Sequence, residues 1–134
     1  MSDTNTLLIE YSKNPQNKYI IKDPTIHYRE QNRLCADVIE VFLRIEDSII
    51  TEWSFDGYMS IVATASSSLF GESIIWMTID EVIHLREPYI KQFFPDGISS
   101  RRRNGSVIAI LATRNALHAL KEDSIQDDFS DILE

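Results

Sequence analysis

Cys35 and Asp37 are the residues of this chain whose types and spacing come closest to metal chemistry. A thiolate and a carboxylate two residues apart, at the start of an expected strand, could share a metal ion. Soft iron and zinc sites usually take several thiolate or imidazole ligands, so this pair alone would bind a metal weakly. Cys35 is the single cysteine of the chain. Two interpretations of it stay open, a buried inert thiol and a remaining ligand.

Common catalytic signatures are absent from the sequence. It contains no Gly-x-Ser-x-Gly, no P-loop, no His-Glu-x-x-His and no Cys-x-x-Cys pattern. His27 lies on an expected strand and is predicted to face solvent. His84 and His118 lie towards helix ends, where a solvated or dipole-facing histidine is expected. We therefore expect a protein that is not an enzyme.

The stretch 34–70 contains the elements that must position Cys35 and Asp37. Alternation of apolar and polar residues predicts three strands, over residues 25–29, 37–45 and 49–55. Helical spacing follows Ser60, a plausible N-cap, and Gly71 is a plausible stop. Because helices must cover the apolar face of the sheet, the expected fold class is α+β, a three-stranded antiparallel sheet with helices packed on one face.

Four further helices are expected outside this stretch, over residues 6–13, 79–85 and 87–94 and from near residue 106 onwards. Thr78 and Glu81 form a capping box at the start of one of them. The small hydroxyl residues 66–68 are expected to let their helix approach the sheet closely. Trp76 is expected in the core, with a place on the surface as the alternative.

Several short motifs follow one another along the chain: Asn14-Pro15-Gln16-Asn17, Leu34-Cys35 with Asp37, Phe55-Asp56-Gly57, Ala65-Ser66-Ser67-Ser68, Thr78-Ile79-Asp80-Glu81-Val82 and Asn115-Ala116-Leu117. Their order resembles the NifU/IscU family of iron–sulfur cluster assembly scaffolds, over roughly residues 11–120. The resemblance implies the NifU N-terminal or IscU-like fold and a role in cluster assembly. It also implies iron or an iron–sulfur cluster as cofactor, and a protein partner such as a cysteine desulfurase or a cluster acceptor.

This chain departs from the family at its ligand positions. Scaffolds of the family hold their cluster with three cysteines, and the resemblance leaves Cys35 and Asp37 as the candidate cofactor and metal ligands here. On the family pattern the second cysteine would fall at Ser60 and the third at Gly105, while Ala36 stands where the family usually has glycine. Two functions stay open: a scaffold with a degenerate cluster site, or a non-catalytic interaction or regulatory protein that kept the scaffold fold and binds no cluster.

The working surface is expected at one corner of the fold. In the resembled family, the segments that correspond to Cys35 with Asp37, to residues 58–60 and to residues 103–109 converge on the cluster. Loops held by a rigid sheet commonly carry binding residues. The arginine run 101–103 would join Tyr58 at this corner, a composition that suits a protein partner better than a metal.

Composition sets the remaining expectations. One domain is expected over residues 1–120, followed by an acidic, mobile tail over 121–134, which holds six acidic residues and one lysine and carries −5 of the net charge of −8. The acidic balance argues against nucleic-acid binding, and no apolar run reaches the length of a membrane helix. A single cysteine and the lack of a basic N-terminal start favour the cytoplasm.

Overall fold

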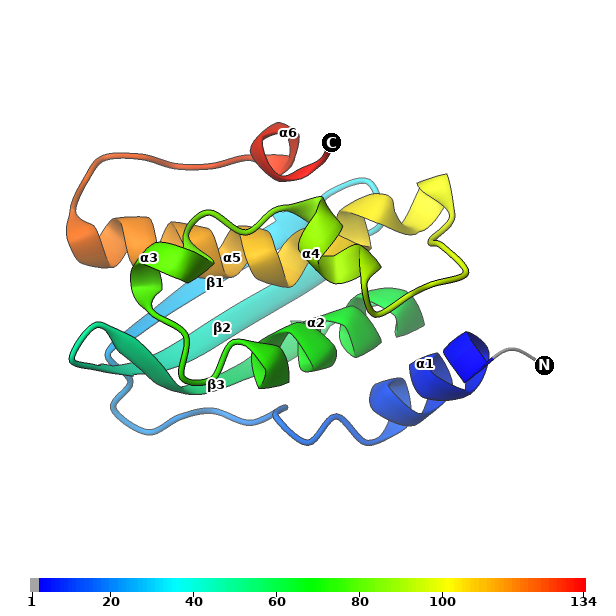
Figure 1. Ribbon diagram of the computed structural model, residues 1–134, viewed down its shortest axis with the longest axis horizontal. Coiled ribbons are helices and arrows are strands. Elements are labelled where there is room, and N and C mark those ends of the chain that lie inside the picture. The colour runs from blue at the N-terminus through cyan, green and yellow to red at the C-terminus, as the bar shows by residue number, and fades with distance from the viewer. Residues whose placement is uncertain (1–2) are drawn as a thin grey trace.

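A three-stranded antiparallel sheet of order β1-β2-β3 forms the centre of the computed structural model, which describes residues 3–134 and all their side chains except those of residues 3–5 and 7 (Figure 1). The strands are β1 (Ile26–Asn32), β2 (Asp37–Glu46) and β3 (Ile49–Tyr58). The predicted α+β fold class is confirmed. Both β1 and β3 run three residues beyond their predicted ends, because Asn32 pairs with Asp37 and Tyr58 pairs with Val38.

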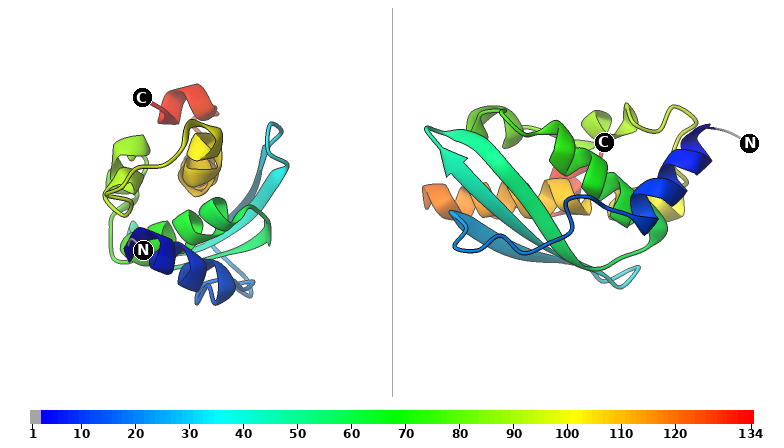
Figure 2. Two further views of the ribbon diagram at one scale, coloured as in Figure 1. Left: turned by 90° about the vertical axis from the view of Figure 1, so that its right-hand side faces the viewer. Right: turned by 90° about the horizontal axis from the view of Figure 1, so that it is seen from below.

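Helices cover one face of this sheet. The two longest, α2 and α5, lie against each other across it, α1 packs beside α2, and α6 lies on the outer side of α5 (Figures 1 and 2). The helical elements are α1 (Asp3–Lys13), α2 (Ile61–Ser73), α3 (Ile79–Val82), α4 (Glu87–Lys91), the 3-10 turn η1 (Ser100–Arg102), α5 (Arg103–Lys121) and α6 (Phe129–Ile132). No helix within the described residues is both long and apolar enough to cross a membrane.

The core forms between the helices and the inner face of the sheet. Ile39, Val41 and Leu43 are fully buried, as the alternation along β2 predicts. The pairing of β2 with β3 shifts by one residue next to Arg44, since Arg44 pairs with Glu52 and Ile45 pairs with Ile50. As a result Ile50 is fully buried, whereas its neighbour Ile49 is only partly buried. A bulge of this kind cannot be inferred from a period of two, since it changes which face each later residue occupies.

Gly71 does not end α2, which continues to Ser73. A Cβ atom at position 71 would lie 2.0 Å from the Trp53 ring, so this glycine allows the indole to pack against the helix. Ser66, Ser67 and Ser68 are fully buried, as expected for residues that let a helix approach a sheet. The predicted stop at Gly71 is therefore wrong, because the residue serves packing between α2 and β3.

Trp76 lies at the end of the molecule away from the start of α2, and it is 73% exposed. Its backbone N–H donates to the Ile50 carbonyl at 2.7 Å, and its φ of +74° is the left-handed conformation. The expectation of a core tryptophan is wrong, because these backbone contacts fix the main chain with the indole outside. The short helices α3 and α4 also end three residues before their predicted ends.

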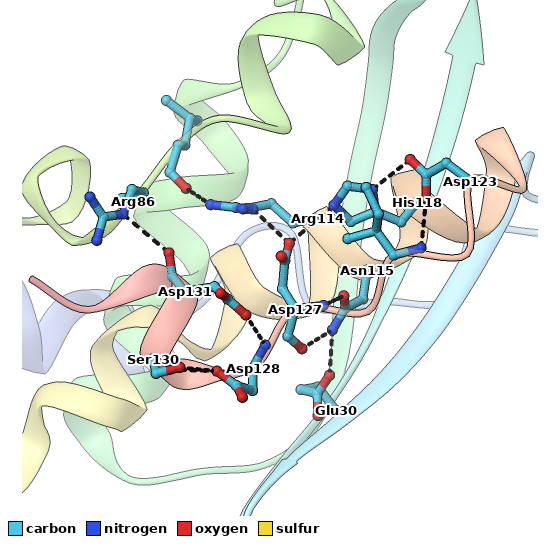
Figure 3. A network of polar contacts seen from close by, with 12 residues as sticks. Glu30, Arg86, Arg114, Asn115, His118, Asp123, Asp127, Asp128, Ser130 and Asp131 are labelled. Carbon is cyan, nitrogen blue, oxygen red and sulfur yellow. Dashed lines mark hydrogen bonds and ion pairs between the residues drawn. The ribbon is translucent and has the colours of Figure 1, made fainter.

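Residues 122–134 fold back along α5 (Figure 3). The Asp127 N–H donates to Asn115 Oδ1 at 2.7 Å, and Ile132 in α6 is fully buried. This packing differs from the mobile tail expected from the sequence, because the acidic residues of the segment find partners on α5. One partner is His118, which is buried in the last turn of α5. The solvated alternative of its prediction is therefore wrong, while its place near the C-terminal end of the helix agrees with the dipole-facing one. A domain boundary near residue 120 stays a prediction.

Candidate functional site

The turn between β1 and β2 brings Cys35 to one corner of the fold, next to η1 and the start of α5. The end of β3 and the starts of α2 and α5 lie at the same corner. The turn is unusual at Ala36, whose φ of +57° is a conformation that glycine adopts most easily. Cys35 is exposed, so the interpretation of a buried thiol is wrong.

Asp37 is the buried centre of this corner. Its side chain is 1% exposed, its Oδ1 accepts the Ser60 N–H at 2.9 Å, and its Oδ2 accepts Asn32 Nδ2 at 3.3 Å. Both carboxylate oxygens are therefore engaged by neutral donors. One of these donors lies at the N-terminus of α2, where the helix dipole favours a negative charge.

Ser60 and Gly105, the positions where family cysteines would fall, lie against Asp37. The Ser60 hydroxyl caps α2 by accepting the Ala63 N–H at 3.2 Å. A Cβ atom on Gly105 would lie 3.0 Å from Asp37 Oδ2 and 3.7 Å from Ser60 Oγ. The structure thus brings together Asp37, Ser60 and Gly105, as expected, and uses all three for packing and hydrogen bonding.

Cys35 lies at the rim of this cluster, next to η1. Its thiol donates to the Arg101 carbonyl at 3.7 Å. No group of three histidine, cysteine or acidic side chains suited to hold a metal ion occurs within residues 3–134, apart from the side chains left undescribed. A tetrahedral iron in a cluster takes four ligands, most often thiolate and sulfide. A single exposed thiol and a carboxylate with both oxygens occupied do not fit that requirement.

Exposed apolar side chains surround the corner. Leu34 is 84% exposed, Tyr58 87% and Ile61 59%. Tyr58 was predicted on this surface, whereas Leu34 and Ile61 were not. Ile61 follows the helical spacing of the apolar residues of α2, yet its position in the first turn leaves it outside the core. The place of Leu34 in a turn was the available signal, since turns lie at the surface.

Arg103, at the start of α5, is partly exposed and is paired with a buried carboxylate. Its Nε donates to Glu87 Oε2 at 2.8 Å and its Nη2 to Glu87 Oε1 at 2.6 Å. The Arg103 guanidinium holds the pKa of the Glu87 carboxyl at about 2, below its usual 4.5. The charge of Arg103 is therefore paired with Glu87, although its side chain remains 36% exposed. A partner surface that includes residues 101–103 stays a prediction. No spacing in the sequence links Arg103 to Glu87.

The family model of the NifU-like N-terminal domain matches residues 4–126. The chain belongs to this family. The corner of this NifU-like domain is therefore the place where the family resemblance located two absent cysteines, and the structure fills both positions with packed residues.

Known relatives of this NifU-like domain agree with the assignment. The iron–sulfur cluster assembly scaffold protein IscU of Thermotoga maritima is 28% identical over 80 residues, which are 60% of this chain and 56% of that protein. The match thus spans little more than half of the relative.

Two solved structures share the fold. A NifU-like protein (N-terminal) from Brucella abortus has a TM-score of 0.74 and 17% identity, with 90% of this chain and 95% of that one covered. A protein of Fervidobacterium islandicum is described as an iron–sulfur cluster assembly scaffold for the SUF system. It has a TM-score of 0.71 and 18% identity, and the match covers 87% of this chain and 96% of that one. The predicted NifU N-terminal fold is confirmed.

Proposed function

We propose that this NifU-like domain acts in iron–sulfur cluster assembly as a partner-binding scaffold with a degenerate cluster site, and not as an enzyme. Family membership and the relatives described as scaffolds support a place in cluster assembly. The observation that carries the proposal is the corner itself, where Leu34, Tyr58 and Ile61 are exposed around a free thiol. A partner of this pathway, a cysteine desulfurase or a cluster acceptor, is the expected ligand.

The composition of the corner favours a protein partner. Tyrosine and arginine are enriched among the residues that carry most binding energy at interfaces, and Tyr58 and Arg101 are both exposed here. The underlying Asp37 cluster is fully hydrogen-bonded, so the corner offers a rigid base for contact. Rigid surfaces lose little conformational entropy on binding, which favours affinity.

The same corner argues against stable cluster binding by this chain alone. Cys35 supplies the one thiol, and Ser60 Oγ is engaged in capping α2. Gly105 has no side chain that could bind iron. Iron or a cluster would need further ligands from a partner or a second copy. The alternative function is a regulatory protein that binds the same partner through the same surface. It differs only in that no cluster is ever bound.

Partner capture tests the docking surface. A cysteine desulfurase is immobilised and the affinity of the wild-type chain is compared with that of Tyr58→Ala and of Arg102→Glu. Trp76→Ala is the matched control, because it also removes an exposed aromatic side chain but at the opposite end of the fold. We expect Tyr58→Ala to weaken capture about tenfold or more and the control to leave it unchanged. Equal capture by all folded variants would place the docking surface elsewhere.

Reconstitution separates the two functions. The chain is incubated anaerobically with iron and sulfide, desalted, and assayed by visible absorption and metal analysis, with and without the desulfurase. We expect substoichiometric iron on the chain alone, and a cluster that depends on Cys35 only in the presence of the partner. Stoichiometric iron and sulfide that survive desalting without a partner would contradict a degenerate site. No cluster under either condition would favour the regulatory alternative.

A further inference from the structure

The first turn of α5 lacks the groups that usually stabilise a helix start. Arg102 occupies the N-cap position without a side-chain hydrogen bond, and no acidic residue lies in the first turn. The run of three arginines places positive charge at the positive end of the helix dipole, which is unfavourable. This helix start therefore depends on support from outside its own sequence.

Glu87 supplies part of that support. It is 2% exposed, and both of its oxygens accept from Arg103, the first residue of α5. Arg103 Nη2 also donates to the Glu134 backbone oxygen at 2.7 Å, and the Glu134 N–H donates to Glu87 Oε1 at 3.0 Å. Three segments far apart in the sequence thus meet around one guanidinium group.

Arg86 fixes the same chain end from the neighbouring position. Its Nε donates to the Asp131 carbonyl at 3.1 Å and its Nη2 to the Leu133 carbonyl at 3.0 Å. Between these two contacts, Ile132 is fully buried. The end of the chain is therefore held by a buried aliphatic side chain and by two arginines that bind its backbone.

The beginning of the same segment is held further along α5 (Figure 3). Asp127 Oδ2 lies 2.9 Å from Arg114 Nε and 3.1 Å from His118 Nε2, and Asp123 Oδ2 lies 2.8 Å from His118 Nδ1. Arg114 and His118 are both largely buried by this packing. The acidic residues of the segment thus meet cationic and histidine side chains of α5 at one end, while the segment reaches Arg103 at the other.

We propose that residues 123–134 form a strap that holds the first turn of α5 in place and thereby sets the accessibility of the corner. Arg103 lies between Arg101, whose carbonyl accepts the Cys35 thiol, and Gly105, which packs against Asp37. Loss of the strap would make the start of α5 more mobile, and with it the residues of η1 and α5 that contact Cys35 and Asp37. The consequence for partners rests on the proposed function, whereas the mechanical coupling does not. The family match ends at residue 126, so most of the strap lies outside it.

Hydrogen exchange tests this coupling directly. Two variants release the strap, Arg86→Ala and a chain that ends at residue 126. Arg29→Ala is the matched control, since it removes an exposed arginine side chain on β1 that makes no hydrogen bond or ion pair within the described residues. We expect amide exchange over residues 100–106 to rise by about fivefold to tenfold in both variants, the effect of losing one helix cap. Exchange in β2 should stay unchanged, and alkylation of Cys35 should become faster.

The outcomes separate the strap from the docking function. The proposal is overturned if residues 129–134 exchange faster in Arg86→Ala while residues 100–106 keep the wild-type rate. It is also overturned if the shortened chain keeps its circular dichroism spectrum and its slow exchange at the start of α5. Neither measurement involves a partner, so unchanged capture of Tyr58→Ala would contradict the proposed docking surface but not the proposed strap. Unchanged amide exchange over residues 100–106 would contradict the strap but not the docking surface.

Discussion

Two buried carboxylates organise the two sides of the α5 start, and they are compensated differently. Asp37 accepts hydrogen bonds from the neutral Ser60 N–H and Asn32 side chain. Glu87 is paired with the Arg103 guanidinium and also accepts the Glu134 N–H. Of the two, only Glu87 has a positive side chain among its hydrogen-bond partners.

The difference shows what each site can tolerate. At Asp37 the buried carboxylate is stabilised by neutral hydrogen-bond donors, so an anionic sulfide–thiolate cluster beside it would add repulsion that these donors do not offset. At Glu87 the charge is balanced, and the site serves to bind chain segments together. Hydrogen bonds to Asp37 therefore stabilise the exposed surface of the corner. The ion pair of Glu87 with Arg103 instead connects α4, α5 and the last residues of the strap.

The largest effect is expected at Asp37. Replacing it by alanine leaves the Ser60 N–H and the buried Asn32 amide without their acceptor, and should lower the free energy of unfolding by about 2–4 kcal/mol. Urea denaturation at pH 7 measures the loss. Asp56→Ala, an exposed aspartate on β3, is the control and should change stability by less than about 0.5 kcal/mol. If the two variants are equally stable, Asp37 does not organise the corner.

A smaller, pH-dependent effect is expected at Glu87. Glu87→Gln keeps the shape of the side chain but removes the charge-assisted bonds to Arg103, and should cost about 1–3 kcal/mol near neutral pH. The pKa of Glu87 is lowered from 4.5 to about 2. The stabilisation is therefore complete above about pH 4.5 and is lost as the pH falls towards 2.

Denaturation of wild type and variant as a function of pH tests this sign. The difference between Glu87→Gln and wild type should shrink between about pH 4.5 and pH 2. Glu10→Gln, at an exposed position of α1, should show no such trend. A difference that grows on acidification would mean that the Arg103 pair does not stabilise the folded chain.

The sequence predicted the sheet and the main helices well because their patterns are local. Alternation along β2 and the switch to helical spacing after Ser60 depend on neighbouring residues alone. The bulge opposite Arg44, the role of Gly71 under Trp53 and the exposure of Trp76 depend on contacts between distant segments. The expectations for Gly71 and Trp76 were wrong for this reason.

The corner could be predicted only in outline. The family resemblance indicated that Asp37, Ser60 and Gly105 would converge, and the structure brings these residues together. The helical pattern after Ser60 predicted this residue as the N-cap of α2, and the structure confirms it. Nothing in the sequence indicated that Arg103 pairs with Glu87. The acidic composition of the last segment suggested mobility. A charge count does not reveal that the buried side chains of Arg114 and His118 on α5 face those acids.

The smallest effect is expected from rebuilding the cluster ligands. Ser60→Cys with Gly105→Cys would place two thiols against Asp37, at the corner that also carries Cys35, and should raise iron retention after anaerobic reconstitution above that of wild type. The gain should be partial, because the new Cβ at position 105 lies 3.0 Å from Asp37 Oδ2 and forces the carboxylate to move. The same double variant with Cys35→Ser is the control, and its retention should fall back towards wild type. If the double variant retains no more iron than wild type, the three positions do not form a ligand set in this fold, and the corner differs from a cluster site by more than its missing thiols.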